Sequence, residues 1–298
     1  MKIHRLTDSP PPWLEEALAA FEQHFRYPLG PADSFSISHA PDYTAFFRSM
    51  GTACVYVAEV DGAVAGILTV VRRAVILADG SRVPAAYFCD TKVAPQHRGT
   101  PVLARLALMA RDDVMSAGIT AAYAVVMAGS PTPDSYTGRL GIPAFRKLAS
   151  LIVMRIPVSA SPDFSCVEWQ YDFPENAMRP TGGDASNRSL MSPLAVGAGH
   201  ATGVLMDTRR GKRLWDRNGT EMLSAHLVNV SCRKPLEWRM LLDQALLEAR
   251  RAGFPAVFTS LPASSIAATS GQISGWTRAA VFGIGLPGGC WQVDTAEI

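Results

Sequence analysis

The sequence has little that would indicate a nucleic-acid-binding or membrane-spanning protein. The formal net charge is +2 over 298 residues, and only 18% of the residues are charged, whereas nucleic-acid binders usually carry a basic stripe. No apolar run approaches the roughly 20 residues of a membrane helix. The opening MKIHRLTDSPPP contains no apolar stretch of signal-peptide length. We therefore expect no nucleic-acid partner, no membrane span and no secretory leader.

Cysteine is scarce and unpatterned. Five cysteines are an odd number, and no Cys-x-x-Cys occurs, so neither a disulfide framework nor a zinc site is indicated. The histidines show no metal-ligand spacing. The strings G-x-S-x-G, Walker A and H-E-x-x-H are also missing. The sequence predicts no metal site and favours a reducing cytoplasm.

What the chain has is enough apolar sequence for a large core. Apolar residues make up 48% of the chain, which excludes disorder over the whole length. A length of 298 residues suggests two ordinary domains or one large one. The tight basic cluster at residues 209–213 is interpreted as a solvated hairpin tip.

The N-terminal half shows a helix-rich start followed by a meander of strands. Asp61-Gly62 is a favoured two-residue hairpin turn. The expected elements are an edge strand at 1–7, helices at 13–25 and 41–50, and strands at 53–60, 63–76 and 84–93.

Residues 87–114 form the most informative segment, which we expect to be a strand, a short loop and an amphipathic helix. Gly99 in the loop would let the backbone approach an anion closely. The first N–H groups of a helix lack internal partners and, with the helix dipole, favour a phosphate. The apolar run 120–127 is typical of a strand buried on both faces and parallel to a neighbour. A short helix at 133–143 and a long strand at 146–158 would close this half.

The order of elements recurs after a proline-rich interval at 158–195, which is interpreted as a linker or long excursion. The later elements are a hairpin at 199–215, strands at 221–232, 256–262 and 277–287, a helix at 235–253 and a weak helix at 263–272. Strand, helix, strand, short helix and strand therefore occur twice. The fold class is α/β (α+β), with two halves, each a mixed central sheet flanked by helices.

This pattern resembles the GNAT acyltransferase superfamily. The resemblance rests on two helices, a meander, a strand ending in Val93-Ala94-Pro95, an Arg-Gly loop and a helix. The family's loop reads Gln or Arg, two residues, Gly, one residue, then Gly or Ala. Here the loop is QHRGTP, residues 96–101, and it departs from the family at Pro101. Proline suits the first position of a helix but removes one backbone donor.

The two-fold order is similar to that of tandem members of the superfamily. In the second half the corresponding loop, residues 232–236, has no glycine, so this copy resembles a degenerate one. The resemblance thus implies an N-terminal GNAT-like acyl-CoA-binding domain at 1–158, a linker or excursion at 159–195, and a degenerate GNAT-like domain at 196–298.

Membership would imply an N-acyltransferase that passes an acyl group from acetyl-CoA, or a longer acyl-CoA, directly to an amine. The pyrophosphate would lie on the loop, and the pantetheine would pair with backbone near Val93. The cofactor-binding positions implied in this way are Val93, Gln96, His97, Arg98, Gly99, Thr100 and Val102. The acceptor would be a small-molecule or peptide amine.

Two residues are candidates for the chemistry. Asp90 is a charge within an apolar strand, three residues before Val93, where the family often carries an acidic residue that could serve as a base. Tyr136 is the candidate acid for the leaving thiolate. If Gly141 is the family's glycine, however, the matched position is Thr137. The competing interpretations are a structural hydrogen bond for Asp90 and ring packing for Tyr136.

Two other functions remain open on the same resemblance. One is a non-catalytic acyl-CoA or ligand sensor, and the other is an acyltransferase specific for long acyl chains. The sequence does not decide among acceptors, acyl-chain lengths or oligomeric states.

Overall fold

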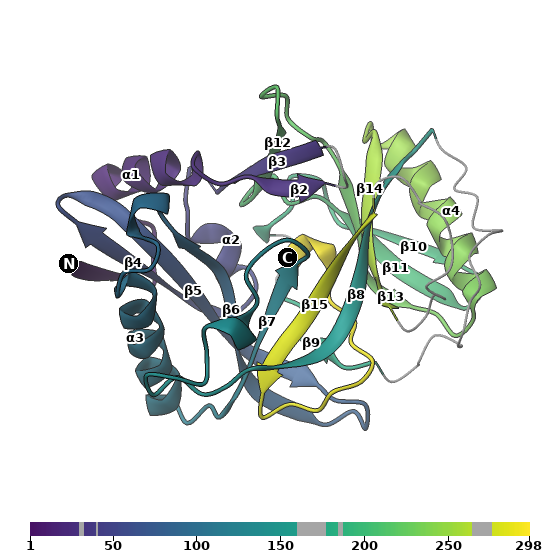
Figure 1. Ribbon diagram of the computed structural model, residues 1–298. Coiled ribbons are helices and arrows are strands. Elements are labelled where there is room, and N and C mark those ends of the chain that lie inside the picture. Colours follow the sequence, from purple (N-terminus) through teal and green to yellow (C-terminus); the bar gives the residue numbers. More distant parts are fainter. Residues whose placement is uncertain (30–32, 40, 160–176, 184–186, 264–275) are drawn as a thin grey trace.

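A large mixed sheet runs through the whole molecule (Figure 1). The computed structural model describes residues 1–29, 33–39, 41–159, 177–183, 187–263 and 276–298. Within these residues, a 12-stranded sheet has the order β1-β4-β5-β6-β7-β15-β8-β14-β13-β11-β10, with β9 paired to β5. A separate three-stranded sheet has the order β12-β3-β2. The predicted mixed α/β architecture is confirmed.

The N-terminal half folds as its sequence pattern predicts. The hairpin between β4 and β5 turns at Asp61 and Gly62, which have φ of 51° and 80°, as a type I′ turn requires. The elements are β1 (Lys2–Leu6), α1 (Pro12–Glu22), β2 (Tyr27–Leu29), β3 (Asp33–Ser38), α2 (Ala45–Arg48), β4 (Thr52–Val60), β5 (Ala63–Ile76), β6 (Arg82–Val93), η1 (Pro95–His97), α3 (Val102–Ser116), β7 (Ala121–Met127), η2 (Pro133–Ser135) and β8 (Arg146–Pro157).

Helices cover both faces of this half of the sheet. Side chains of β5 alternate between two apolar clusters, because successive strand residues point to opposite faces. Ile67 packs with Leu14 and Leu18 of α1, whereas Leu68 packs with Leu106 of α3. The two faces of the sheet are therefore enclosed by α1 and α2 on one side and by α3 on the other.

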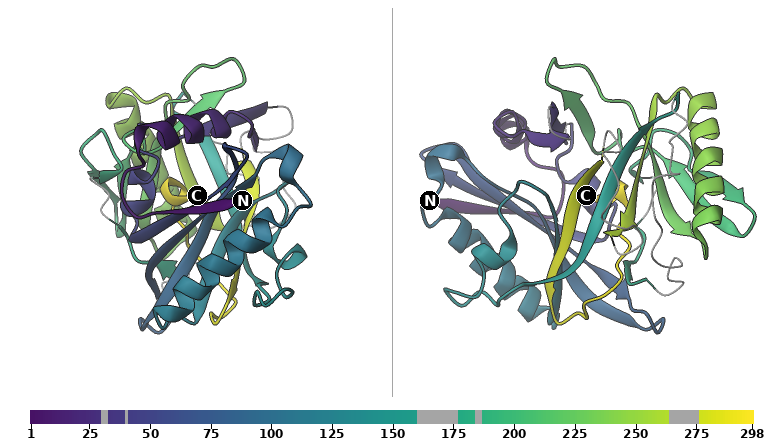
Figure 2. Two further views of the ribbon diagram at one scale, coloured as in Figure 1. Left: turned by 90° about the vertical axis from the view of Figure 1, so that its left-hand side faces the viewer. Right: turned by 45° about the vertical axis from the view of Figure 1, so that its right-hand side comes forward.

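The second half repeats a strand–helix–strand unit. Strand β13 is parallel to β14 through α4, just as β6 is parallel to β7 through α3. Figure 2 shows α3 and α4 at opposite ends of the sheet. The elements are β9 (Arg179–Pro180), β10 (Leu194–Ala198), β11 (Ala201–Met206), β12 (Arg213–Asp216), β13 (Ala225–Ser231), α4 (Pro235–Arg251), β14 (Ala256–Pro262), β15 (Trp276–Ile284) and η5 (Thr295–Glu297). None of the described helices is long and apolar enough to cross a bilayer.

The two halves exchange their last strands. Strand β15, the last strand of the chain, pairs with β7 of the first half, and β8 of the first half pairs with β14 of the second. Strands β15 and β8 also pair with each other. One apolar cluster accordingly contains Leu18 and Phe47 together with Phe258, Val281 and Trp291. Neither half has a complete sheet without the other.

The predicted hairpin at 199–215 is wrong. Strand β11 pairs with β10 and β13, whereas β12 leaves the large sheet and pairs with β3. The turn between them packs so closely on α2 that a Cβ on Gly211 would lie 2.9 Å from Phe46 Cα. The solvated hairpin tip is wrong for the same reason, since Lys212 is only 3% exposed.

The predicted excursion at 158–195 includes ordered pairings among its described residues: β9 pairs with β5, Met178 forms a bridge with Trp291, and β10 begins at Leu194. The weak helix expected at 263–272 falls largely outside the described residues, which stop at 263 and resume at 276.

Candidate functional site

Strands β6 and β7 are paired over only part of their length and then diverge. Their parallel pairing runs only from Ala85 opposite Ala121 to Tyr87 opposite Tyr123, although β6 continues to Val93 and β7 to Met127. Figure 1 shows the two strands diverging beyond this point. The last six residues of β6 therefore have a backbone edge that is not paired with β7.

Near the end of β6, the backbone N–H and C=O groups of one residue point into this opening. Ala94 donates its N–H to Ala65 O at 2.9 Å, toward β5. Because successive backbone groups of a strand point to opposite edges, the N–H and C=O of Val93 point toward the opening. This is the position at which the sequence predicted pairing with an extended ligand.

A β-bulge sets the direction of Asp90. Between Ile67–Lys92 and Thr69–Cys89 the register of β6 advances by one residue more than that of β5, and Asp90 has φ of 48°. Bulges redirect side chains and are frequent beside functional sites. Here the bulge brings Asp90 and Lys92 to the face of the sheet that is covered by α1 and α2.

The loop after β6 leaves only some of its backbone donors free, because the N–H groups of His97, Arg98 and Thr100 donate within the loop. Gly99 has φ of 77°, and a Cβ on it would meet nothing within 4 Å. Helix α3 begins at Val102, one residue later than expected, so Pro101 is its N-cap. The first helical N–H groups, from Val102 to Ala104, lack partners within the helix. Exposed Arg98 adds a positive charge beside them. These groups together suit an anion.

Asp90 belongs to a buried polar cluster drawn from α1, from the segment between β3 and α2, and from β6. Lys92 Nζ lies 2.6 Å from Asp90 Oδ1 and 3.2 Å from Glu22 Oε1. The Tyr43 hydroxyl donates to Asp90 Oδ2. His39 Nδ1 lies 2.6 Å from Glu22 Oε1, and the His39 backbone N–H donates to the same carboxylate. All five side chains are at most 8% exposed. We call this set of five residues the Asp90 cluster.

The charges within the Asp90 cluster stabilise one another. Burial alone would raise the pKa of the Asp90 carboxyl, but the Lys92 ammonium holds that pKa below its ordinary value. Burial would likewise lower the pKa of Lys92, whereas Asp90 and its neighbours raise it. Burial beside Asp90 also raises the pKa of the Tyr43 hydroxyl. Asp90 is therefore ionised at neutral pH and bonded to two donors.

The cluster also contains three side chains with metal-ligand chemistry. Ligand atoms of Glu22, His39 and Asp90 lie within 4.8 Å of one another. The Lys92 ammonium already bonds to both carboxylates. A second cation between them would meet that positive charge at close range, which is unfavourable at a buried site.

Tyr136 lies in the loop that leads from β7 to β8. It follows the 3-10 helix η2, and burial raises its pKa to about 12. The neighbouring Thr137 is used structurally, since its hydroxyl donates to Pro133 O at 2.7 Å and accepts from the Phe145 N–H at 3.0 Å. The structure thus shows a defined loop around Tyr136 but no described contact between Tyr136 and Asp90.

Sequence reasoning found Asp90 and missed the other four members of the Asp90 cluster. Glu22 and His39 lie 70 and 53 positions before Lys92 in the printed sequence, so no local spacing connects them. One usable signal was Lys92, a second charge in the same apolar strand as Asp90, because buried charges of opposite sign usually pair.

Comparison with known proteins agrees with this geometry. Residues 13–141 match the family model of the acetyltransferase (GNAT) domain. The matched region contains α1, the meander, the loop after β6, α3 and the loop of Tyr136. No curated protein matches the sequence. The resemblance to the GNAT superfamily is confirmed for this region.

Solved structures extend the likeness to nearly the whole chain. Two structures of Saccharomyces cerevisiae N-myristoyltransferase with bound myristoyl-CoA are 10% identical and cover 94% of this chain, with 82% and 78% of their own chains covered and TM-scores of 0.55 and 0.56. A GCN5-related N-acetyltransferase from Anabaena variabilis is 13% identical over 94% of this chain and 72% of its own, with a TM-score of 0.47. The N-myristoyltransferase alignments show a common fold.

Proposed function

We propose that this chain, whose residues 13–141 form a GNAT domain, is an N-acyltransferase that passes an acyl group directly from acyl-CoA to an amine. The observation that carries the proposal is that the pairing of β6 with β7 ends at Tyr87 and Tyr123, although both strands continue. It leaves an open backbone edge that leads to the N-terminus of α3. An extended ligand with a phosphate at one end matches both features.

The donor would bind on the α3 side of the opening. The backbone of Val93 would pair with the pantetheine, and the pyrophosphate would lie on the loop and first turn, residues 96–102. The Arg98 side chain has no hydrogen bond or ion pair in the described part of the chain, so its guanidinium is available to a phosphate. Bound acyl-CoA would supply a thioester, whose carbonyl carbon is attacked by the acceptor amine while CoA leaves as a thiolate.

The acceptor would approach from the other face of the sheet, where the Asp90 cluster lies. An ionised carboxylate at this face attracts an acceptor ammonium and can take the proton that the amine must lose. Tyr136 would supply a proton to the thiolate. The lowered pKa of Asp90 keeps its carboxylate ionised at neutral pH, as both roles require.

The second half, residues 196–298, would form one wall of the acceptor site. It would be the second copy of a tandem pair, with a degenerate donor site of its own. Two contacts support this. Strand β12 pairs with β3 above the first half, and the Tyr87 hydroxyl donates to Glu297 O at 3.0 Å. The donor-binding unit is then residues 1–158, and residues 159–195 connect the two.

A non-catalytic acyl-CoA-binding protein is the second candidate. It is favoured by the Asp90–Lys92 ion pair, which holds the pKa of Asp90 low and makes it a weak base at neutral pH.

The two candidates differ in turnover. We would incubate the full chain with acetyl-, octanoyl- and myristoyl-CoA and a panel of amines, amino acids and lysine peptides, and measure released CoA thiol together with the mass of the product. The enzyme predicts amine-dependent thiol release and an acylated amine. Binding of one CoA per chain without turnover on any acceptor supports the sensor, and absence of CoA binding overturns both.

A further inference from the structure

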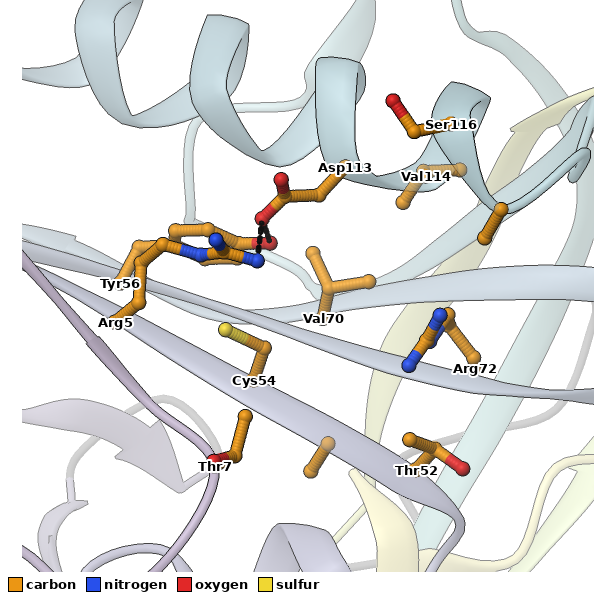
Figure 3. A pocket seen from close by; sticks show the side chains of 12 residues that line it. Arg5, Thr7, Thr52, Cys54, Tyr56, Val70, Arg72, Asp113, Val114 and Ser116 are labelled. Atoms are coloured by element: carbon orange, nitrogen blue, oxygen red, sulfur yellow. Dashed lines mark hydrogen bonds and ion pairs between the residues drawn. The ribbon is translucent and has the colours of Figure 1, made fainter.

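A cavity lies at the other end of α3 from the Arg-Gly loop. It has a volume of about 300 Å³ and lies between β1, β4, β5 and the last turn of α3. A helix of 15 residues is about 22 Å long, so the cavity is far from the donor-binding loop. Figure 3 shows the side chains that line it. Its size is at the lower end of the range of small-molecule sites.

The floor of the cavity is a patch of sheet. Cys54 is opposite Val70, and Thr52 is opposite Arg72, in the pairing of β4 with β5. Paired residues point to the same face of a sheet, so these four side chains lie together under α3. Buried Val114 closes the cavity from the helix. The interior is therefore apolar, and its rim carries hydroxyl groups.

The charges of the cavity do not cancel. Arg5 and Asp113 form an ion pair at 2.6 Å, and the Tyr56 hydroxyl donates to the same carboxylate oxygen at 2.6 Å. The exposed side chain of Arg72, by contrast, forms no ion pair or hydrogen bond with any residue that the structure describes, and it lines the cavity in Figure 3. One positive charge remains without a counterion.

The C-terminus of α3, beside the cavity, repels an anion less strongly than an uncapped helix C-terminus would. Its last carbonyls are capped, because Ala117 and Gly118 donate to Asp113 O and Met115 O, and Ile119 donates to Val114 O. Such a cap satisfies the carbonyl groups that otherwise carry the negative end of the dipole.

We propose that this cavity binds a small organic monocarboxylate, separately from the acyl-transfer site. The Arg72 guanidinium would take the carboxylate in its fork of donors, with the Thr52 hydroxyl beside it. The short apolar body would lie on Val70 and Val114. A phosphate dianion fits less well, since one of its charges would remain uncompensated beside the Asp113 carboxylate.

The test uses butyrate as the carboxylate ligand and butyramide, an uncharged compound of similar shape, as the control. The full chain, labelled at its valine methyl groups, is titrated with each compound and with inorganic phosphate, followed by NMR. Val70 and Val114 report on the cavity, and Val102 at the other end of α3 reports on the donor loop. We expect butyrate to shift Val70 and Val114 with a Kd on the order of 1 mM, a usual value for so small a ligand, and to leave Val102 unchanged.

Three variants decide the assignment. Arg72→Gln removes the charge and should weaken butyrate binding roughly tenfold. Arg82→Gln, at an exposed arginine outside the cavity, should leave it unchanged. Thr52→Trp fills the cavity from an exposed strand position, where an aromatic is well tolerated, and should abolish binding. The proposal is overturned if butyrate shifts neither cavity valine, if butyramide or phosphate binds equally well, or if Arg72→Gln binds as the wild type does.

This outcome is independent of the proposed function. CoA should shift Val102 whether or not butyrate binds, and saturating CoA should leave the butyrate affinity unchanged. Loss of the CoA response alone counts against the donor site, and loss of the butyrate response alone counts against the cavity.

Discussion

The Lys92 ammonium lies 2.6 Å from Asp90 Oδ1, and both side chains are at most 8% exposed. This pair exists because a bulge in β6 inserts one extra residue after Cys89 and so turns both Asp90 and Lys92 to the face covered by α1 and α2. It gives the candidate base a fixed position and a fixed charge. The same pair limits how readily Asp90 can take a proton.

Asp90→Asn should lower turnover by about 100- to 10,000-fold, the usual cost of losing a general base, with CoA affinity unchanged. Tyr136→Phe should lower turnover by less than about tenfold, or roughly 1.4 kcal/mol of transition-state stabilisation. Steady-state rates with an identified acceptor test the ranking. If Tyr136→Phe is the more damaging change, the Tyr136 loop moves toward the thioester during the reaction.

Lys92→Met should destabilise the fold by about 3–5 kcal/mol, because it leaves the Asp90 and Glu22 carboxylates buried without a cation. In the variant the pKa of Asp90, which Lys92 holds down in the wild type, should rise, so the loss of stability relative to wild type should narrow as the pH falls from 7 to 5. Urea unfolding at both pH values measures this. Lys147→Met is the control, since Lys147 is an exposed lysine on β8, and its effect should stay within about 0.5 kcal/mol.

Gly99→Glu should weaken CoA binding by about 100-fold or more, because it places a carboxylate where the pyrophosphate would lie. Gly80→Glu is a matched control. Both glycines have positive φ, 77° and 82°, and a Cβ on either meets nothing within 4 Å, so the backbone strain is alike. Calorimetry with CoA compares the two. Equal affinities in the two variants, or two CoA molecules per chain, would rule out this loop as the single donor site.

The free energy of unfolding should rise with pH because Lys212 is buried and loses its proton more readily in the folded chain. Burial lowers its pKa from 10.5 to about 7, so between these values the unfolded chain binds the proton and the folded chain does not. The free energy of unfolding therefore rises with pH across this window, by on the order of 3 kcal/mol between pH 7 and about 9.5. Lys212→Met should remove that rise. Urea unfolding of both proteins at the two pH values gives the difference, and parallel pH curves would contradict the prediction.

Residues 196–298 expressed alone should give an insoluble or non-cooperative product. Strand β15 lies between β7 and β8 of the other half, so isolation removes both of its partners and exposes apolar surface at a cost of about 25 cal/mol per Å². Co-expression with residues 1–195 should restore a soluble complex with one thermal transition. A soluble isolated fragment with a sharp transition would show that the strand exchange is dispensable.

Local features of the fold could be predicted from the sequence. The apolar periodicity of α3, the Asp61-Gly62 turn and the loop at Gly99 involve residues within one or two turns of one another, and their backbone preferences act over that range. The GNAT resemblance followed from the order of these elements. Asp90 was identifiable because a charge within an apolar strand needs a partner.

The partners themselves were decided by the tertiary structure. Glu22 and His39 reach Lys92 only through the packing of α1 and β3 on the sheet. The prediction of a hairpin at 199–215 was wrong because β12 pairs with β3, a strand nearly 180 residues earlier in the chain. Burial of Lys212 and the exchange of β8 with β15 likewise depend on contacts between the halves. Sequence patterns specify which face of an element is apolar, whereas the identity of the surface that covers it depends on how all the elements pack together.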